Sequence, residues 1–151
     1  MKENRYMDVI TQGVYILGVK DAGKINFMTA AWITQVSANP NKLLVAVGKS
    51  HFTAEMLRNA REFSVNVLGV GQEALAKKCG SVSGRNTDKS LKVDYELADG
   101  IPVMKDVAAR LFCTLDKEIQ DEDHILFIAI VKDGQSYEKQ PLIYDENEYF
   151  G

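Results

Sequence analysis

Short apolar runs separated by turn residues make up most of this chain of 151 residues. Residues 13–20 and 25–36 are rich in β-branched side chains and predict two strands, and Asp21–Lys24 between them has the composition of a hairpin turn. These two strands are therefore expected to pair antiparallel. Ser37–Asn41 is a second predicted turn, and Leu43–Val47 is an apolar run of the right length for a buried strand.

Two segments have helical spacing instead. Thr53–Arg61 repeats its apolar side chains at the period of a helix, and the hydroxyl of Ser50 or Thr53 is a candidate cap for its first turn. Gln72–Cys79 predicts a second short helix, which Gly80 is placed to end.

The second half of the chain returns to strand patterns. Phe63–Leu68 alternates apolar and polar residues and predicts a half-buried strand with Ser64 and Asn66 on its polar face. Val107–Leu115 alternates in the same way, and Gly100–Pro102 before it is a predicted turn.

The most apolar stretch is His124–Lys132, which fits a strand buried on both faces, either in the core or at a subunit contact. It follows an acidic turn at Gln120–Asp123 and precedes a predicted turn at Asp133-Gly134. Pro141–Tyr144 predicts one more short strand.

The fold class follows from this count. Six or seven strands at short spacing with two short helices predict a mainly β protein, an antiparallel barrel or sandwich. A parallel sheet needs a helix between most strand pairs, and these helices are missing. The length predicts a single domain over residues 1–151.

Composition narrows the function classes. The formal net charge is −3, and no basic stripe is available to neutralise phosphates, so a nucleic-acid partner is not expected. No apolar run is long enough for a membrane span and residues 1–10 do not form a signal peptide, so the expected location is the cytoplasm. Cys79 and Cys113 are predicted to be free interior thiols, and two histidines with no ligand spacing predict no metal site.

The sequence contains no G-x-S-x-G nucleophile elbow, no Walker motif and no dinucleotide fingerprint. The informative segment is Gly48–Thr53, where a glycine, Lys49 and hydroxyls meet the start of a predicted helix. Such a place suits an anion such as phosphate, because helix N-termini present unpaired N–H groups. The alternative is a plain strand-to-helix connection with a capping hydroxyl.

Further polar groups lie among the apolar runs. The long loop Ser81–Lys92 carries Arg85 and Lys89, and is either functional or a solvated connection. Trp32 fits either a ligand platform or the core, and His124 either a catalytic group or a surface histidine. Together these residues suit a flat, largely apolar ligand with a phosphate held by the segment around Lys49.

Eight segments carry a resemblance to a known family. They are GVYILGVKDAGKIN, MTAAWITQVSANP, LLVAVGKSHFT, FSVNVL, CGSVSGRNTDK, GIPVM, DHILFIAIV and PLIYDENEYF. In this order and spacing the chain resembles the flavin reductase-like family with the FMN-binding split-barrel fold, in the branch of flavoredoxin, archaeal ferric reductase and the flavin domain of high-molecular-weight rubredoxin.

The resemblance implies an antiparallel Greek-key split barrel that works as a homodimer, with FMN near the subunit contact. It implies that the second strand contacts the flavin ring and ribityl chain, through Thr29, Ala30, Ala31, Trp32, Thr34 and Ser37. It implies that the next segment takes the phosphate, through Val47, Gly48, Lys49, Ser50, His51 and Thr53. The SGRNTDK loop would close over the flavin with Ser83, Gly84, Arg85 and Lys89.

The implied activity is an FMN-binding oxidoreductase that passes electrons from NADH or NADPH to free flavin, ferric iron or a redox protein. His124 would lie near the reacting face of the flavin, orienting the nicotinamide or supplying a proton; the acidic Asp123 before it departs from the family, which often has Gly or Thr there. No rubredoxin-type cysteine domain follows, so a separate acceptor is expected. The alternatives are an FMN electron carrier without NAD(P)H activity and a non-redox binding module on the same barrel.

Overall fold

A computed structural model of the protein describes residues 5–80, 83–84 and 88–145. Over these residues one antiparallel sheet has seven strands. Their order across the sheet is β2 (Lys24–Ala30), β1 (Tyr15–Asp21), β5 (Glu62–Val67), β8 (Ala109–Gln120), β9 (His124–Ser136), β4 (Asn41–Gly48) and β3 (Ile33–Ala38). The predicted antiparallel, mainly β fold is confirmed, as is the hairpin of the first two strands.

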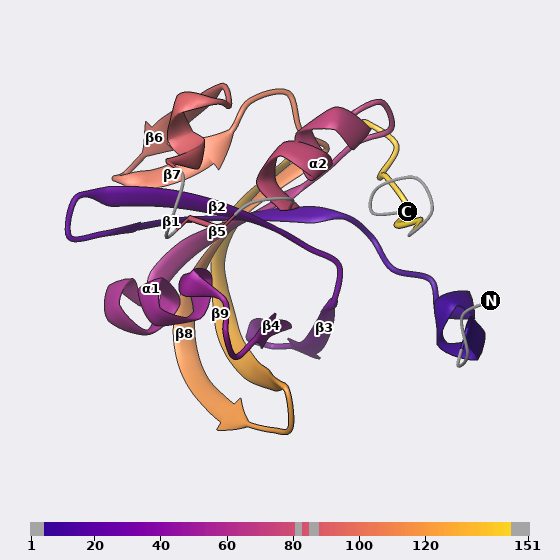
Figure 1. The fold of residues 1–151 in the computed structure, drawn as a ribbon, viewed down its shortest axis with the longest axis vertical. Coiled ribbons are helices and arrows are strands. Elements are labelled where there is room, and N and C mark those ends of the chain that lie inside the picture. The colour runs from indigo at the N-terminus through magenta and orange to yellow at the C-terminus, as the bar shows by residue number, and fades with distance from the viewer. Residues whose placement is uncertain (1–4, 81–82, 85–87, 146–151) are drawn as a thin grey trace.

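Smaller elements cover this sheet on both sides. Figure 1 shows α2 (Glu73–Gly80) and the hairpin of β6 (Tyr95–Ala98) and β7 (Ile101–Met104) on one side of β1, β2 and β5. On the other side lies α1 (Phe52–Ala60), together with the curved hairpin of β8 and β9 and the strands β4 and β3. Two 3₁₀ turns, η1 (Arg5–Val9) and η2 (Lys89–Leu91), complete the described elements.

Two hydrophobic clusters result from this arrangement. The cluster inside the barrel packs Leu57 of α1 against inward-facing residues of the sheet such as Phe63 and Phe127, and all three are fully buried. The second cluster lies between β1, β2 and the elements covering them, and includes Phe27 and Cys79. Because β1 and β2 contribute to both clusters, both faces of this edge of the sheet are apolar.

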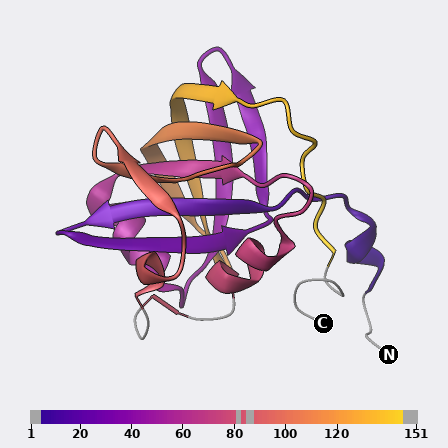
Figure 2. The same ribbon diagram turned by 90° about the horizontal axis from the view of Figure 1, so that it is seen from above.

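The C-terminal segment runs beside the N-terminal one. The Tyr144 N–H donates to the Gln12 carbonyl at 2.8 Å, and isolated bridges join Gly13 to Ile143 and Gly69 to Pro141. In Figure 2 this yellow segment descends past the start of β1. The prediction of a strand at Pro141–Tyr144 is therefore wrong, because this segment forms two isolated bridges and no continuous strand pairing.

The predicted strand 25–36 is two strands. β2 ends at Ala30 and β3 begins at Ile33, with Trp32 in the break. β2 pairs with β1 and β3 pairs with β4, at opposite ends of the strand order. The break carries the chain from one edge of the sheet to the other, which the sequence does not reveal because Ala31-Trp32 carries no turn residue.

The strand predicted at 63–68 is confirmed as β5, but it is not half-buried, because both of its faces are covered. Ser64 and Asn66 have no exposed surface. The Ser64 hydroxyl donates to the Pro102 carbonyl at 2.7 Å, and Asn66 accepts a hydrogen bond from the Met104 N–H at 3.0 Å. Both partners lie on β7. The turn predicted at Gly100–Pro102 therefore comes earlier in the structure, since Ile101 and Pro102 already belong to this strand.

β8 and β9 are longer than the sequence predicts. Asp133 and Gly134 lie inside β9 and not in a turn, and the pairing shifts by one residue near Cys113, which is typical of a β-bulge. Within β9, Ile125, Phe127 and Ala129 face the barrel interior. Cys79 and Cys113 are both free and buried, as predicted.

Candidate functional site

Two adjoining cavities open along β2. The first has a volume of about 330 Å³, and we call it the Lys89 cavity; it is lined by Met28, Thr29, Ser50, His51, Phe52, Thr53, Cys79, Gly80, Ser83, Gly84 and Lys89. The second has a volume of about 220 Å³, and we call it the Trp32 cavity; it is lined by Met28, Thr29, Ala30, Ala31, Trp32, Ala46, Gly48, His51, His124 and Tyr144. Met28, Thr29 and His51 line both, so the two cavities adjoin along β2.

Lys89 is a buried cation, only 4% exposed. Its ammonium donates to the carbonyl oxygens of Phe27 at 2.8 Å and Cys79 at 2.7 Å. Burial lowers the pKa of Lys89, because the charged form loses hydration. A lysine ammonium has three donors, and these two bonds occupy two of them. Lys89 forms no ion pair with any described residue, so an anion in this cavity would supply the missing counter-charge.

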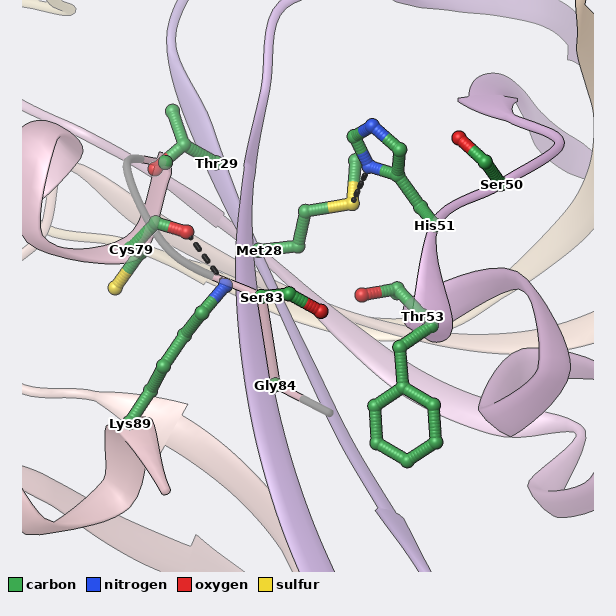
Figure 3. A pocket seen from close by; sticks show the side chains of 11 residues that line it. Met28, Thr29, Ser50, His51, Thr53, Cys79, Ser83, Gly84 and Lys89 are labelled. Atoms are coloured by element: carbon green, nitrogen blue, oxygen red, sulfur yellow. Dashed lines mark hydrogen bonds between the residues drawn. The ribbon is translucent and has the colours of Figure 1, made fainter. Parts of the chain in front are cut away.

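The opposite wall is the start of α1. His51 is the residue before the helix and its side chain makes no capping bond, so the predicted cap by Ser50 or Thr53 is wrong. The first N–H groups of a helix have no partner within it and carry partial positive charge. Figure 3 shows Ser50, His51 and Thr53 on this side, Thr29, Cys79 and Lys89 on the other, and the Met28 side chain between them.

The hydroxyl of Thr29 is already engaged. It donates to the Ala76 carbonyl of α2 at 2.6 Å. Thr29 therefore ties β2 to α2 at the boundary of the two cavities, and its remaining capacity toward a ligand is as an acceptor.

Two aromatic rings shape the Trp32 cavity. The ring centroids of Trp32 and His124 are 4.6 Å apart, with 34° between the ring planes. Trp32 is 53% exposed, which contradicts the core interpretation of this residue. Flat apolar walls of this kind suit a planar ring system.

His124 is also oriented by an acid. Its Nδ1 lies 2.7 Å from the Asp123 carboxylate, and this bond holds the pKa of Asp123 below its usual value. The bond leaves Nε2 of His124 as the nitrogen for other partners.

His51 stands between the two cavities. Its Nδ1 is 3.2 Å from the Met28 sulfur, as Figure 3 shows. Partial burial lowers the pKa of His51, and the neighbouring Lys89 and His124 act in the same direction. His51 is therefore neutral at neutral pH, and the positive charge in the Lys89 cavity comes from Lys89 and the helix.

The structure brings most of the predicted site residues together. Those lining one or both cavities are Thr29, Ala30, Ala31, Trp32, Gly48, Ser50, His51, Thr53, Ser83, Gly84, Lys89 and His124. Those lining neither cavity are Thr34, Ser37, Val47 and Lys49. Arg85 lies outside the described residues.

The four remaining residues have other surroundings. Val47 is fully buried in the barrel core, and Thr34 and Ser37 lie on the edge strand β3. Lys49 is exposed, and its backbone N–H donates to the Asp123 carbonyl at 3.0 Å. The lysine that lines a cavity is thus Lys89. Lys49 lines neither cavity, and its role as a phosphate ligand stays a prediction.

Several lining residues were not predicted, among them Met28, Phe52, Cys79, Ala46 and Tyr144. Met28 had a sequence signal, since it precedes Thr29 in the segment assigned to the flavin. Cys79 and Tyr144 had none, because α2 and the C-terminal segment reach the site only through the tertiary fold.

The donor set fits a flat cofactor with a phosphate. A buried lysine, a helix N-terminus and hydroxyls lie at one end, and two rings lie at the other. No cluster of three or more metal-ligating side chains occurs in the part of the chain that the structure describes. Among the same residues, no helix has the length and apolar character needed to cross a membrane.

Comparison with known proteins gives a family match. Residues 7–151 match the family model described as Flavin reductase like domain. NADH-dependent flavin reductase StyB from Pseudomonas fluorescens is 27% identical over 143 residues, 92% of this chain and 82% of StyB. High molecular weight rubredoxin from Moorella thermoacetica is 27% identical over 135 residues, 87% of this chain.

The chain is shorter than several relatives. It spans 65% of an uncharacterised Archaeoglobus fulgidus protein, 59% of the Moorella rubredoxin and 44% of a Rhizobium meliloti protein named probable flavin reductase. The Archaeoglobus and Rhizobium proteins are each 32% identical to it, over 74% and 91% of this chain.

Solved structures share the fold over most of the chain. An FMN-binding protein from Thermus thermophilus has a TM-score of 0.89 and 26% identity, covering 100% of this chain and 91% of its own. NADH:FAD oxidoreductase SgcE6 from Streptomyces globisporus has a TM-score of 0.88 and 26% identity, covering 93% and 85%. Flavoredoxin from Methanosarcina acetivorans has a TM-score of 0.81 and 28% identity, covering 99% and 81%.

Proposed function

The chain belongs to the flavin reductase-like family, and on that basis we propose that it is an FMN-binding oxidoreductase. It takes a hydride from NADH or NADPH and passes the electrons to free flavin, ferric iron or a redox protein. When bound, FMN supplies the electron-transfer chemistry, and the protein supplies binding, orientation and access.

The observation that carries this proposal is that the two cavities adjoin, with Met28, Thr29 and His51 lining both. A buried cation without a counter-ion among the described residues faces one cavity, and a pair of aromatic rings faces the other. A flavin mononucleotide has the matching order of parts, a phosphate joined by a flexible chain to a planar ring.

In this assignment Lys89, the first turn of α1 and the hydroxyls of Ser50 and Thr53 hold the phosphate. Trp32 and His124 border the ring, with His124 placed to orient the nicotinamide or supply a proton. The assignment to FMN is supported by the match with the Thermus FMN-binding protein, whereas SgcE6 has also been solved with NAD and FAD fragments. Binding titrations with FMN and FAD in parallel distinguish the two flavins.

The proposal includes a homodimer with the flavin near the subunit contact. Trp32, Val36 and Ile119 are 53%, 47% and 48% exposed; Trp32 precedes β3, Val36 lies on β3 and Ile119 lies near the end of β8. A second copy packed there would cover the open side of the Trp32 cavity. Light scattering coupled to size-exclusion chromatography tests this: a mass of one chain, about 17 kDa from a chain mass of 16.8 kDa, contradicts it.

A second candidate is an FMN electron carrier that does not react with NAD(P)H. The match to flavoredoxin over 99% of the chain supports it, as does the match to high molecular weight rubredoxin. Both candidates use the same flavin site and differ only in whether a nicotinamide reaches the ring.

The deciding experiment is the visible absorbance of the purified protein, reconstituted with FMN under anaerobic conditions, before and after adding NADH and then NADPH. Bleaching of the flavin band by either nucleotide supports the reductase. A band that persists supports the carrier. A protein that binds no FMN overturns both and leaves a non-redox binding module.

A further inference from the structure

Asn26 is a buried polar residue in the middle of an apolar strand. It lies on β2 and is 1% exposed. Its side-chain N–H group donates to the Thr53 hydroxyl oxygen at 3.1 Å, across 27 residues of sequence. Its Oδ1 is buried and has no hydrogen-bond partner among the described residues. A buried acceptor left unpaired costs free energy, so an asparagine here is not explained by stability.

The surroundings of Asn26 connect it to the Lys89 cavity on two sides. Thr53 lines that cavity and is itself 2% exposed. Gly84 lines it too, and a Cβ on Gly84 would lie 2.6 Å from Cγ and 2.8 Å from Nδ2 of Asn26, in contact with Oδ1 as well. The amide of Asn26 therefore stands directly behind the cavity wall, and only glycine fits at position 84 beside it.

The direction of the hydrogen bond fixes the Thr53 proton. A hydroxyl group has one donor and two acceptor sites. Because the Asn26 amide is itself the donor, the Thr53 oxygen accepts and its own proton remains available. The cavity in front of Thr53 holds the start of α1 and the Lys89 ammonium, which together favour an anion.

We infer that Asn26 is a positioning residue for the phosphate end of the site: its amide holds the Thr53 hydroxyl so that the hydroxyl proton points to the bound phosphate. This inference rests on the proposed flavin function. It adds to it a residue that touches no ligand and acts through Thr53.

The test compares the affinities of FMN and riboflavin, which differ only in the phosphate. Flavin fluorescence titration gives the ratio of the two dissociation constants for each variant. Asn26→Leu keeps the branched shape and removes the donor, and Asn26→Asp keeps the shape but accepts the Thr53 proton. Both are expected to weaken FMN binding about tenfold relative to riboflavin, the size of one hydrogen bond to a charged group.

Matched variants separate positioning from folding. Asn66→Leu removes another fully buried asparagine, whose amide bonds to the Ile16 carbonyl and not to the cavity, and should leave the ratio unchanged. Thr53→Ser keeps the hydroxyl and should retain the ratio. Thr53→Val should lose the preference for FMN over riboflavin. Adding Asn26→Leu to Thr53→Val should cause no further loss of this preference.

Five outcomes overturn the inference. One is a normal ratio in a folded Asn26→Leu or Asn26→Asp variant, and another is a normal ratio in Thr53→Val. A third is additive losses in the double variant, which would show that Asn26 acts independently of Thr53. Equal affinity of the wild-type protein for FMN and riboflavin also overturns it and leaves the flavin function standing, whereas binding of neither overturns both.

Discussion

The ammonium of Lys89 donates to the carbonyl oxygen of Cys79 at 2.7 Å, in the last turn of α2. A cation at this end of a helix is favourable, since it satisfies a terminal carbonyl and faces the negative end of the helix dipole. A second bond to the Phe27 carbonyl at 2.8 Å ties the same ammonium to β2. Lys89 is thus held in place by backbone groups before any ligand arrives, which reduces the ordering cost of binding an anion.

Replacing Lys89 by methionine should therefore weaken FMN binding by about ten- to hundredfold and riboflavin binding much less. It should also lower the free energy of unfolding, because two buried carbonyl oxygens lose their donor. Fluorescence titration with both flavins isolates the first effect from the second. An unchanged FMN-to-riboflavin ratio would place the phosphate elsewhere.

Lys49→Ala is the companion measurement, because sequence analysis predicts Lys49 as the phosphate ligand. We expect weaker FMN binding in this variant too, but by less than in Lys89→Met. Lys49 is exposed and lines neither cavity, so solvent and salt screen its charge. A larger loss in Lys49→Ala than in Lys89→Met would reverse the assignment of the two lysines.

The pH dependence of this binding has a defined sign. Burial lowers the pKa of Lys89 from the ordinary lysine value of 10.5. As pH rises through this lowered pKa, the ammonium loses its charge, so the preference for FMN over riboflavin should fall at pH values below 10.5. In the unfolded chain Lys89 keeps its proton up to the ordinary lysine pKa. Between the lowered pKa of the folded protein and this ordinary value, the unfolded state binds more protons, so Lys89 by itself makes the ligand-free protein more stable as pH rises.

Titrations with both flavins and thermal unfolding of the ligand-free protein, from neutral pH to about pH 10, measure these opposite trends. In Lys89→Met the decline in FMN preference over this range should disappear. A decline of the same size in that variant would assign the titration to another group.

The sequence predicts the elements better than their connections. The hairpin at Asp21–Lys24 and both helices follow from local turn chemistry and periodicity, which act over a few residues. The break at Trp32 does not, because no turn residue marks it and only the tertiary fold sends β2 and β3 to opposite ends of the strand order. The burial of Ser64 and Asn66 was missed for a similar reason. Their hydrogen-bond partners on the covering strand β7 each lie 38 residues later in the chain.

The site shows the same division. Ser50 and Thr53 were found because hydroxyls beside a predicted helix start are a local pattern. Lys89 was a candidate as a cation in a long polar loop, and the resemblance placed it near the flavin. Its burial and its two carbonyl partners could not be predicted, because they depend on contacts with β2 and α2. Asn26 carried a signal in the sequence, as an amide inside an apolar strand, yet its connection to Thr53 is visible only in three dimensions.

His124→Ala should slow the reduction of bound FMN by NADH or NADPH by about ten- to hundredfold, if this ring orients the nicotinamide or supplies a proton. Anaerobic stopped-flow absorbance gives the rate at saturating nucleotide. Asp123→Asn should cause a smaller loss, because Asp123 acts on the orientation of His124 through the 2.7 Å bond. An unchanged rate in His124→Ala rules out both roles.

The packing of β1 against the β6–β7 hairpin predicts a stability effect far from the flavin chemistry. A Cβ on Gly18 would lie 2.6 Å from the Ser64 hydroxyl and in contact with the Pro102 carbonyl oxygen, which are the two partners of a buried hydrogen bond. Gly18→Ala should therefore lower the free energy of unfolding by about 2–3 kcal/mol, since neither group can move without breaking that bond.

Gly69→Ala is the matched control for Gly18→Ala, because a Cβ there meets its nearest neighbours at 3.5 Å, an ordinary contact. Denaturant unfolding of both variants and the wild-type protein measures the difference. Equal stability of the two variants would mean that the hairpin shifts away from β1 at little cost. In that event Ser64 would lose its hydrogen-bond partner on β7. Only apolar contacts and the hydrogen bond of Asn66 would then hold the β6–β7 hairpin against β5.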